Sequence, residues 1–425
     1  MERKYPLEGL RILDFSWVLA GPGATRMLAD HGAEVIKVER PSGEIARNVI
    51  PFRNDVRGTN LSGYYNNINR SKYGVVINLT DPRGKELALK LVKVSDVVVE
   101  NFSRGVMARL GLDYESLKAV KPDIIMVSMG GYGQTGPYQD YVSFGPALQA
   151  LSGSTSLMGF PGHEPAGFGW SYSDYAGGWP TQFAILAALR YRNKTGKGQY
   201  IDVSQLEANC VLHGAGILDY SVNRRAATPT GNRLPHRSAA PHGAYRCRGN
   251  DRWCAIAVFT EEEWQAFCKA IGAPAWTRDE RFATLQARMK HLDELDRHVE
   301  EWTSARTAQQ VMSVLQRHGV AAGVVQSSKD LFEHDPQVKE YGLFKEMEHP
   351  EIGPIAYENV PFKLMDTPGE ARWPAPLLGQ HNSHIFSKVL GLSAKQIETL
   401  TAEGVIGADT GGGIQALGIK MDQPD

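Results

Sequence analysis

Residues 10–39 read LRILDFSWVLAGPGATRMLADHGAEVIKVE, and this stretch decides the fold. It opens with a short apolar strand at 10–15, turns at the glycines and proline of 20–23, and continues with helix-forming residues over 24–31. Residues 33–39 then alternate as a second strand. The order strand, turn, helix, strand predicts a β-α-β unit whose two strands lie parallel.

The same alternation continues to about residue 128. Apolar strands are expected at 74–79, 96–100 and 123–128, with helices at 82–94 and 114–120. Strands that alternate with helices in nearly continuous apolar runs are typical of a parallel sheet covered on both faces. We therefore expect an α/β protein with a Rossmann-like large domain.

The pattern changes near Asn223, where arginines, prolines and a glycine crowd a segment that favours no regular structure. Beyond it we expect a strand at 252–259 and helices at 261–271 and 307–318, which together indicate a smaller α+β domain. The predicted divisions, in chain order, are a large domain (1–204), a linker (205–224), a small α+β domain (225–335), a linker with a return to the large domain (336–406) and a flexible tail (407–425).

The composition excludes several kinds of partner. The 425 residues are 42% hydrophobic and 22% charged, as in a globular protein with two lobes. The 46 Lys and Arg nearly cancel the 47 Asp and Glu, so no overall field favours nucleic acid or an anionic membrane. No apolar run approaches the roughly 18 residues of a membrane-spanning helix, and the first residues carry no targeting signal. We expect a cytoplasmic protein with neither nucleic-acid nor membrane partners.

Two classes of cofactor are disfavoured by the motifs that the chain lacks. Four cysteines without a CxxC pair, and twelve histidines without an HExxH motif, indicate free thiols and no metal site. The turn at 20–23 lies where doubly wound folds bind dinucleotides, but it is not GxGxxG, and Pro22 would obstruct the close approach of a pyrophosphate. The alternative is a tight strand-to-helix turn that needs glycine for its own geometry.

A single acidic residue, Asp174, stands in residues 167–180, which read GFGWSYSDYAGGWP. We expect the next helix to begin at Pro180, which places Asp174 just before a helix, where free N–H groups and the helix dipole stabilise anions. Asp174 is then either a helix N-cap or a carboxylate nucleophile whose flanking amides, at Gly177 and Gly178, bind an oxyanion. These residues alone do not decide between the two.

Several blocks of the sequence resemble those of one enzyme family. The opening strand, turn and second strand are followed by Asn-Arg-Ser-Lys, by a strand ending in Glu-Asn-Phe, by Gly-Tyr-Gly-Gln-Thr-Gly-Pro and by Lys-Thr-Gly-Lys-Gly-Gln. The blocks occupy residues 10–15, 20–22, 32–41, 69–72, 96–102, 131–137 and 194–199. In order and spacing they resemble the class III (family III) CoA-transferases, the group of the formyl-CoA and crotonobetainyl-CoA transferases, from about residue 7 to residue 406.

The resemblance implies that Asp174 is the family's nucleophile. In the family this carboxylate attacks an acyl-CoA thioester to give a mixed anhydride, the CoA thiolate returns to make an aspartyl-CoA thioester, and an acceptor carboxylate takes over the CoA. A carboxylate is ionised at pH 7 without a partner base, and the exchange of one thioester for another is nearly isoenergetic, so no ATP is required. The resemblance thus implies no tightly bound cofactor, with CoA and acyl-CoA as substrates.

The family's CoA-binding positions fall on seven residues of this chain: Val18, Leu19, Arg40, Ile77, Thr80, Asn101 and Arg109. The guanidinium groups of Arg40 and Arg109 are planar and permanently charged, which suits phosphate or adenine. Two positions depart from the family pattern, because Thr80 stands where Lys is frequent and Leu19 where formyl-CoA-type members have Gln. Both departures argue against oxalate or formate as substrate.

The glycine-rich loop that closes over the aspartate in formyl-CoA-type members has no counterpart here. Residues 236–245 stand in its place and resemble other branches of the family. Within them His236, Arg237 and His242 are candidates to meet an acceptor carboxylate, and the alternative is that they are solvated loop residues.

Two other functions compete with CoA transfer. The racemase branch of the superfamily moves a proton at the α-carbon with a His-Asp pair, but the corresponding stretch here, 141–146, has no His, so one of the two bases is missing. A CoA-binding partner subunit without turnover is the other alternative, and the presence of Asp174 argues against it.

The residues and the resemblance together lead to expectations for the substrates and for the oligomeric state. Aromatic residues near Asp174, together with Tyr64 and Tyr65, suit either a bulky or aromatic acyl group or core packing. They are Phe168, Trp170, Tyr172 and Tyr175. Resemblance to members that act on dicarboxylates suggests succinyl-CoA as donor and a substituted, aryl-substituted or similar succinate as acceptor. The family's interlocked-ring dimer, with segments 205–240 and 335–370 completing the ring, implies an obligate homodimer, and a heterodimer with a related subunit is the alternative.

Overall fold

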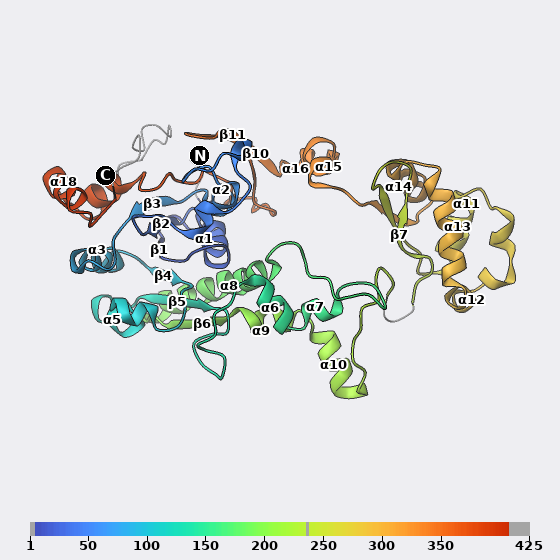
Figure 1. The fold of residues 1–425 in the computed structure, drawn as a ribbon, viewed down its shortest axis with the longest axis horizontal. Helices are drawn as coiled ribbons and strands as arrows, with labels where there is room; N and C mark the ends of the chain where they lie inside the picture. The colour runs from blue at the N-terminus through green and yellow to red at the C-terminus, as the bar shows by residue number, and fades with distance from the viewer. Residues whose placement is uncertain (1–4, 235–237, 408–425) are drawn as a thin grey trace. The chain divides into compact units, whose positions relative to one another are not determined.

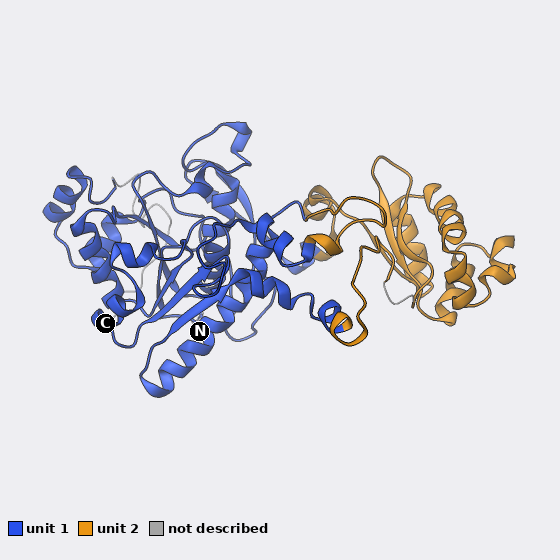
Figure 2. Ribbon diagram, turned by 60° about the horizontal axis from the view of Figure 1, so that its bottom comes forward, with its two compact units in different colours: residues 1–154, 168–218, 338–425 blue, residues 155–167, 219–337 orange. Residues whose placement is uncertain are grey.

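The computed structural model describes residues 5–234 and 238–407 (Figure 1). As far as it is described, the chain forms two compact units (Figure 2), of which unit 1 takes residues 1–154, 168–218 and 338–425 and unit 2 takes residues 155–167 and 219–337. The candidate residues His236 and Arg237, and the predicted tail beyond Gly407, lie outside the described residues.

Unit 1 is built on a six-stranded parallel sheet with the strand order β3-β2-β1-β4-β5-β6. This is the strand order of the Rossmann fold, in which the order reverses between β1 and β4. The strands are β1 Arg11–Asp14, β2 Glu34–Glu39, β3 Tyr73–Val76, β4 Val97–Glu100, β5 Ile125–Gly130 and β6 Tyr200–Ser204. The predicted α/β class with a parallel sheet is confirmed. Of the six strands of this sheet, β6 is the one that the sequence does not predict, because it is an edge strand whose residues are partly exposed.

The remaining elements of unit 1 are mainly helices. They are α1 Ala20–Asp30, α2 Gly63–Asn69, α3 Pro82–Lys93, α4 Val106–Leu110, α5 Tyr114–Val120, α6 Gly145–Leu151, α8 Tyr172–Thr195, α9 Gln205–Val211, α17 Asn382–His384, the π-helical turn Ile385–Val389, α18 Ala394–Ala402, the 3₁₀ turns Ile45–Asn48 and Arg53–Asp55, and the hairpin β10 Phe344–His349 with β11 Gly353–Glu358. Three helices cross the boundaries between the units: α7 Ser154–Leu157, α10 Gly214–Asn223 and α16 Pro336–Tyr341.

Both faces of the sheet are buried, which explains the continuous apolar runs in its strands. Ile12 of β1 belongs to an apolar cluster with residues of α1 and α8, whereas its neighbour Leu13 belongs to a second cluster with residues of α3 and α5. Successive side chains of a strand point to opposite faces, so each strand needs apolar residues at every position. Burial of each such side chain contributes about 1.5–3 kcal/mol.

Residues 205–224 differ from the linker that the sequence predicts, since they contain α9 and all of α10. The Ser204 hydroxyl caps α9 by accepting a hydrogen bond from the N–H of Glu207 at 3.3 Å. The first helix-breaking proline of this region, Pro229, comes only after α10 has ended.

Unit 2 is a small α+β body with an antiparallel sheet of order β7-β8-β9. Its elements are β7 His242–Arg246, β8 Trp253–Ala257, α11 Glu261–Ala270, the 3₁₀ turns Ala275–Arg278 and Glu280–Phe282, α12 Leu285–Lys290, α13 Leu292–Ser304, α14 Ala308–Arg317, β9 Ala321–Val324 and α15 Ser328–Glu333. Thr260 and Thr307 each close a capping box, which starts α11 and α14 where the sequence predicts them. None of the described helices of either unit is long and apolar enough to cross a bilayer.

Candidate active site

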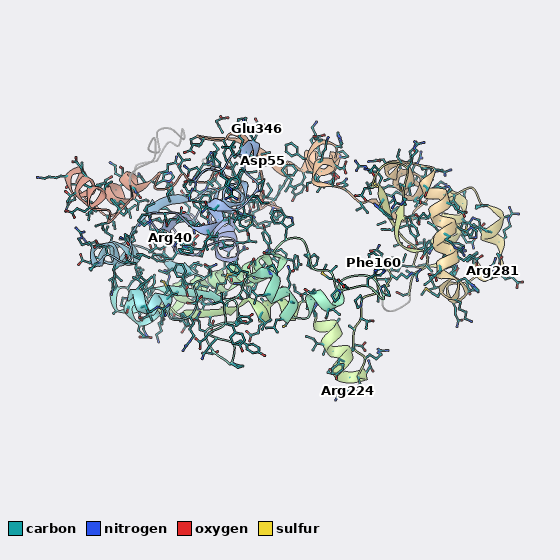
Figure 3. All side chains as sticks on the ribbon, viewed as in Figure 1. Arg40, Asp55, Phe160, Arg224, Arg281 and Glu346 are labelled. Atoms are coloured by element: carbon teal, nitrogen blue, oxygen red, sulfur yellow. The ribbon has the colours of Figure 1, made fainter. Side chains whose placement is uncertain are left out.

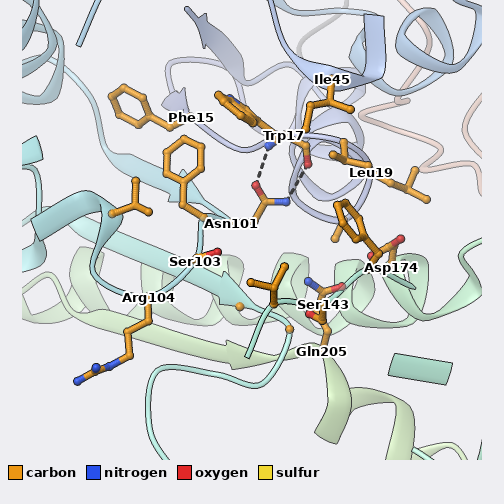
Figure 4. A pocket seen from close by; sticks show the side chains of 18 of the residues that line it. Phe15, Trp17, Leu19, Ile45, Asn101, Ser103, Arg104, Ser143, Asp174 and Gln205 are labelled. Atoms are coloured by element: carbon orange, nitrogen blue, oxygen red, sulfur yellow. Dashed lines mark hydrogen bonds between the residues drawn. The ribbon is translucent and has the colours of Figure 1, made fainter. Parts of the chain in front are cut away.

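A cavity of about 530 Å³ opens at the carboxyl edge of the unit 1 sheet (Figure 4). Ligands of doubly wound sheets bind at this edge. Six of the seven residues expected to bind CoA line the cavity together with Asp174, namely Val18, Leu19, Arg40, Ile77, Thr80 and Asn101. The seventh, Arg109, lies exposed on α4 and is not among the lining residues.

Asn101 acts as a clamp between the ends of β1 and β4. Its Oδ1 accepts a hydrogen bond from the N–H of Trp17 at 2.6 Å, and its Nδ2 donates to the Trp17 carbonyl at 2.8 Å (Figure 4). The Trp17 ring packs edge-on against Phe102, with 5.2 Å between centroids. The Asn101 amide therefore shapes the cavity wall and is already committed to the backbone of the first turn.

Val18 adopts a backbone conformation that β-branched residues rarely take, with φ at 65°. Its N–H donates to Glu44 Oε2 at 2.7 Å, and Lys37 Nζ lies 3.3 Å from Glu44 Oε1. Such a conformation costs about 1–3 kcal/mol and persists only where the surroundings impose it. The buried Lys37–Glu44 pair supplies that constraint by fixing the acceptor for the Val18 amide.

A second buried charge pair holds the end of β1. Asp14 is fully buried, and its carboxylate accepts hydrogen bonds from the Ser16 N–H (2.9 Å), the Thr25 hydroxyl (2.6 Å) and the Lys72 ammonium (3.0 Å). Burial by itself raises the pKa of Asp14, but the nearby ammonium groups and these hydrogen bonds outweigh it and lower the pKa to about 2. Asp14 therefore stays charged at neutral pH and ties β1 to α1.

Asp174 is not a helix N-cap. Helix α8 begins at Tyr172, and Ser171 is its N-cap, so Asp174 is the third helical residue, with its N–H donating to the Ser171 carbonyl at 3.0 Å. Pro180, predicted as the helix start, lies inside α8. The sequence misplaces this start because the first two turns contain glycines and a proline, which are poor helix formers, and packing against the sheet overrides that preference.

The Asp174 carboxylate lies in the cavity wall with Ser143, Gly145 and Gln205 (Figure 4). The residue is 9% exposed, and burial raises the pKa of its carboxyl to about 6, against the opposing effect of a hydrogen bond with the Ser171 side chain. A carboxylate that is ionised at neutral pH yet poorly solvated has the properties of a nucleophile.

Gly145, at the start of α6, permits the close approach of that carboxylate to the backbone. A Cβ at position 145 would lie 2.7 Å from Asp174 Oδ2 and 2.5 Å from Ser171 Cβ, both closer than real contacts allow. The Ser173 hydroxyl also donates to the Gly145 carbonyl at 2.8 Å. Gly145 is not among the predicted site residues, although the Gly-Pro pair that begins α6 marks a helix start.

Gly177 and Gly178, expected to supply oxyanion-binding amides, lie inside α8. An amide at an interior helical position points along the axis to the preceding turn. A Cβ at 177 would lie 2.9 Å from Gln205 Cγ, and one at 178 would lie 3.4 Å from the Ala20 carbonyl oxygen. The two glycines thus let α8 approach α9 and α1, which is a packing role.

The aromatic residues near Asp174 form a second cavity of about 620 Å³. Tyr64, Phe168, Trp170, Tyr172 and Tyr175 line it. Tyr65 is different, because its ring is buried and its hydroxyl donates to Glu39 Oε1 at 2.9 Å, which makes it a core residue.

The acceptor candidate that the structure describes, His242, lies in unit 2 at the start of β7. Its Nδ1 is 2.7 Å from the carbonyl oxygen of Asn232. Residues 141–146, where a racemase would carry its His-Asp pair, hold instead the cavity residues Ser143 and Gly145.

Comparisons with known proteins agree with one another. A model of CoA-transferase family III matches residues 7–382. The chain is 35% identical over 402 residues to the succinyl-CoA–D-citramalate CoA-transferase of Chloroflexus aurantiacus, covering 94% of this chain and 98% of that protein. It is 34% identical over 390 residues to the succinate–glutarate CoA-transferase of Agrobacterium fabrum, covering 91% and 96%. A solved structure of a CAIB/BAIF family protein from Brucella suis matches with a TM-score of 0.84 at 30% identity, covering 91% of this chain and all of that one (100%).

Gly145→Ala is expected to lower CoA transfer by at least about 100-fold while leaving CoA binding within a few-fold, because the new methyl group displaces the Asp174 carboxylate. Steady-state rates and equilibrium binding of CoA measure the two effects. Gly323→Ala, in β9 of unit 2, is the matched control, since a Cβ there meets no atom within 4 Å. Equal rates for the two variants would contradict the assigned geometry.

Asp174→Asn is expected to stabilise the fold at pH 8 and to change its stability little at pH 4. The pKa of the folded carboxyl, about 6, lies above the ordinary value of 3.8, so folding favours the protonated form and the ionised carboxylate reduces stability as the pH rises through this window. The size of this pKa shift limits the gain in the free energy of unfolding to about 1–3 kcal/mol. Urea unfolding of both proteins at the two pH values measures it. A gain of the same size at both would show that ionisation is not its cause.

Proposed function

Since the chain belongs to CoA-transferase family III, and is thereby an enzyme that takes CoA thioesters as substrates, we propose that it moves CoA from succinyl-CoA to a second carboxylic acid through covalent intermediates on Asp174. The observation that carries this proposal is the position of one buried carboxylate, with its pKa raised to about 6, in the wall of a cavity lined by six expected CoA-binding residues.

The reaction proceeds by two reciprocal exchanges. One Asp174 oxygen attacks the thioester carbonyl carbon, the C–S bond breaks, and CoA leaves as the thiolate. The thiolate then attacks the carbonyl carbon of Asp174 in the mixed anhydride, which releases succinate and leaves an aspartyl-CoA thioester. The acceptor carboxylate repeats the sequence in reverse, so the new acyl-CoA forms and Asp174 is regenerated. No proton is gained or lost overall, and thioester exchange needs no energy source.

CoA is held by the first turn and by cationic side chains at the sheet edge. Arg40 (Figure 3) places its guanidinium 4.9 Å from the Trp17 ring centroid, and its Nε donates to the Gly43 carbonyl at 2.9 Å. This arrangement leaves the outer edge of the guanidinium for a phosphate. Arg109, exposed on α4 and outside the lining of the cavity, suits a more distant part of the nucleotide.

The acceptor in this proposal is a dicarboxylic acid, with a substituted or aryl-substituted succinate as the favoured class. The names of the relatives include succinate, glutarate and D-citramalate. The aromatic cavity beside Tyr175 offers room for an aryl substituent. His242, with His236 and Arg237, stays a candidate for contact with the acceptor.

We also propose an obligate dimer, interlocked as in the family. The described part of unit 1 leaves large apolar side chains uncovered on one face of α8, where Trp179, Phe183 and Leu186 follow helical spacing, with Phe183 75% exposed. Helix α10 has no buried residue, and Val222 is 75% exposed. Apolar faces of this kind are covered by a partner in stable proteins, here a second copy or a related subunit.

Incubation with succinyl-CoA and no acceptor is expected to leave a covalent adduct on the peptide that contains Asp174, which hydroxylamine traps as the hydroxamate. Formation of the adduct should rise with pH through about 6 and then level off, because the carboxylate is the attacking species.

Asp174→Ala should abolish both CoA transfer and formation of the adduct, and it should retain CoA binding. Retention of more than about a tenth of the wild-type rate would contradict the assignment of Asp174 as the nucleophile, since loss of a covalent nucleophile lowers the rate by several orders of magnitude. Uptake of solvent deuterium at the α-carbon without an adduct would point to the racemase instead.

Light scattering at micromolar concentration is expected to give twice the chain mass of 46.8 kDa for the purified protein. Phe183→Asp should weaken assembly, because it places a charge in the apolar face of α8. A wild-type monomer would refute the dimer. A dimer that forms only on addition of a related chain would establish the heterodimer.

A further inference from the structure

Asp174 lies between two cavities, and the proposed function accounts for only one of them. Leu19, Ala20 and Asp174 line both the CoA cavity and a smaller one of about 300 Å³ on the α1 side. None of the residues assigned to CoA, apart from Leu19, reaches the smaller cavity. Its volume is at the lower end of the roughly 300–1,000 Å³ typical of small-molecule sites.

The polar groups of the smaller cavity centre on Arg26 of α1. This residue is 9% exposed and faces the cavity with Gln182, Glu358 and Asn359. Its described hydrogen bonds all come from Nη1, which donates to the carbonyl and side-chain oxygens of Asn67 at 3.1 Å and to Glu358 Oε1 at 2.9 Å. Nε is buried and has no hydrogen-bond partner among the described residues.

The edge of the guanidinium that carries Nε and Nη2 therefore makes no described hydrogen bond. Two parallel N–H groups on one edge match the two oxygens of a carboxylate, which is the strongest pairing that Arg makes. A buried donor without a partner is costly, so a ligand that satisfies it gains that free energy on binding.

The ion pairs around the cavity fix the position of Glu358 relative to Arg26. Glu358 is shared by Arg26 and by Arg70, whose Nη1 lies 3.5 Å from Glu358 Oε1, and Arg70 also pairs with the buried Asp30 at 2.9 Å. The two arginines thus balance two carboxylates, and Glu358 is held on the Nη1 side of Arg26. A carboxylate that enters on the opposite edge completes the coordination of Arg26 without displacing Glu358.

From this geometry, and resting on the proposed function, we propose that the smaller cavity binds the acid part of both substrates and that Arg26 holds their distal carboxylate. In the two exchanges, succinate leaves Asp174 before the acceptor arrives, so the two acids occupy the same place in turn. Arg26 is then the residue that selects dicarboxylic over monocarboxylic acids. The bonds of Nη1 hold the guanidinium in position, so the other edge of Arg26 contacts only the ligand.

Succinyl-CoA and butyryl-CoA test the assignment, because their acyl chains have equal length and differ only in the terminal carboxylate. We expect the wild-type kcat/KM to favour succinyl-CoA by roughly 10–100-fold, as for a charge-assisted hydrogen-bond pair. Arg26→Met should remove most of this preference by lowering kcat/KM for succinyl-CoA and leaving that for butyryl-CoA within about threefold. Arg26→Lys, which keeps the charge and loses the fork, should fall between the two.

Arg317→Met, at an exposed position of α14 in unit 2, is the matched control and should leave the preference unchanged. A parallel loss with both donors in Arg26→Met would show that Arg26 only supports the fold, and this overturns the proposal. A wild-type enzyme without preference for succinyl-CoA overturns it without any variant. Either result, obtained with a normal Asp174 adduct, leaves the proposed function standing, whereas the absence of any adduct refutes that function instead.

Discussion

The ion pair between Asp14 and Lys72 is the interaction on which the site depends. Asp14 ends β1, and its three hydrogen-bonding partners are Ser16 of the following turn, Thr25 of α1 and Lys72 of the segment after α2. Lys72 also donates to the Pro22 carbonyl at 2.9 Å, so the first turn of α1 is bound to the same ammonium group. Removal of one partner from such a buried pair leaves an uncompensated charge and costs about 3–5 kcal/mol. The pair thereby fixes where the first turn leaves the sheet.

The chemistry of Asp174 follows from what that turn and α6 place around it. Leu19, Ala20 and Asp174 line both cavities, and Gly145 lets the carboxylate lie close to the backbone. Burial raises the pKa of the carboxyl to about 6, which is still below neutral pH, so the group is mostly ionised there although it is poorly solvated. A single residue can then meet a thioester from one side and a free acid from the other.

Local patterns predict most of the fold because every strand of the sheet except β6 has a strong apolar run. The helix of Asp174 resists such prediction, since packing on the sheet carries α8 through Gly177, Gly178 and Pro180. The resemblance to a family selects Asp174 and six residues that line one cavity in the structure, but it does not show that the amide of Asn101 is bound to Trp17. The roles of Gly145 and Arg26 cannot be predicted from local sequence, because they depend on contacts with residues far away in the chain. The cytoplasmic location and the dimer stay predictions.

Transfer of heavy oxygen tests the covalent account most directly. In the proposed reaction one oxygen of the acceptor carboxylate is left on Asp174 and departs with succinate in the next cycle. With an acceptor acid labelled with ¹⁸O in both carboxylate oxygens, the account predicts that released succinate approaches one labelled oxygen per molecule after the first turnovers, measured by mass spectrometry. Unlabelled succinate, formed at the full rate of CoA transfer in ordinary water, would contradict a covalent path through Asp174.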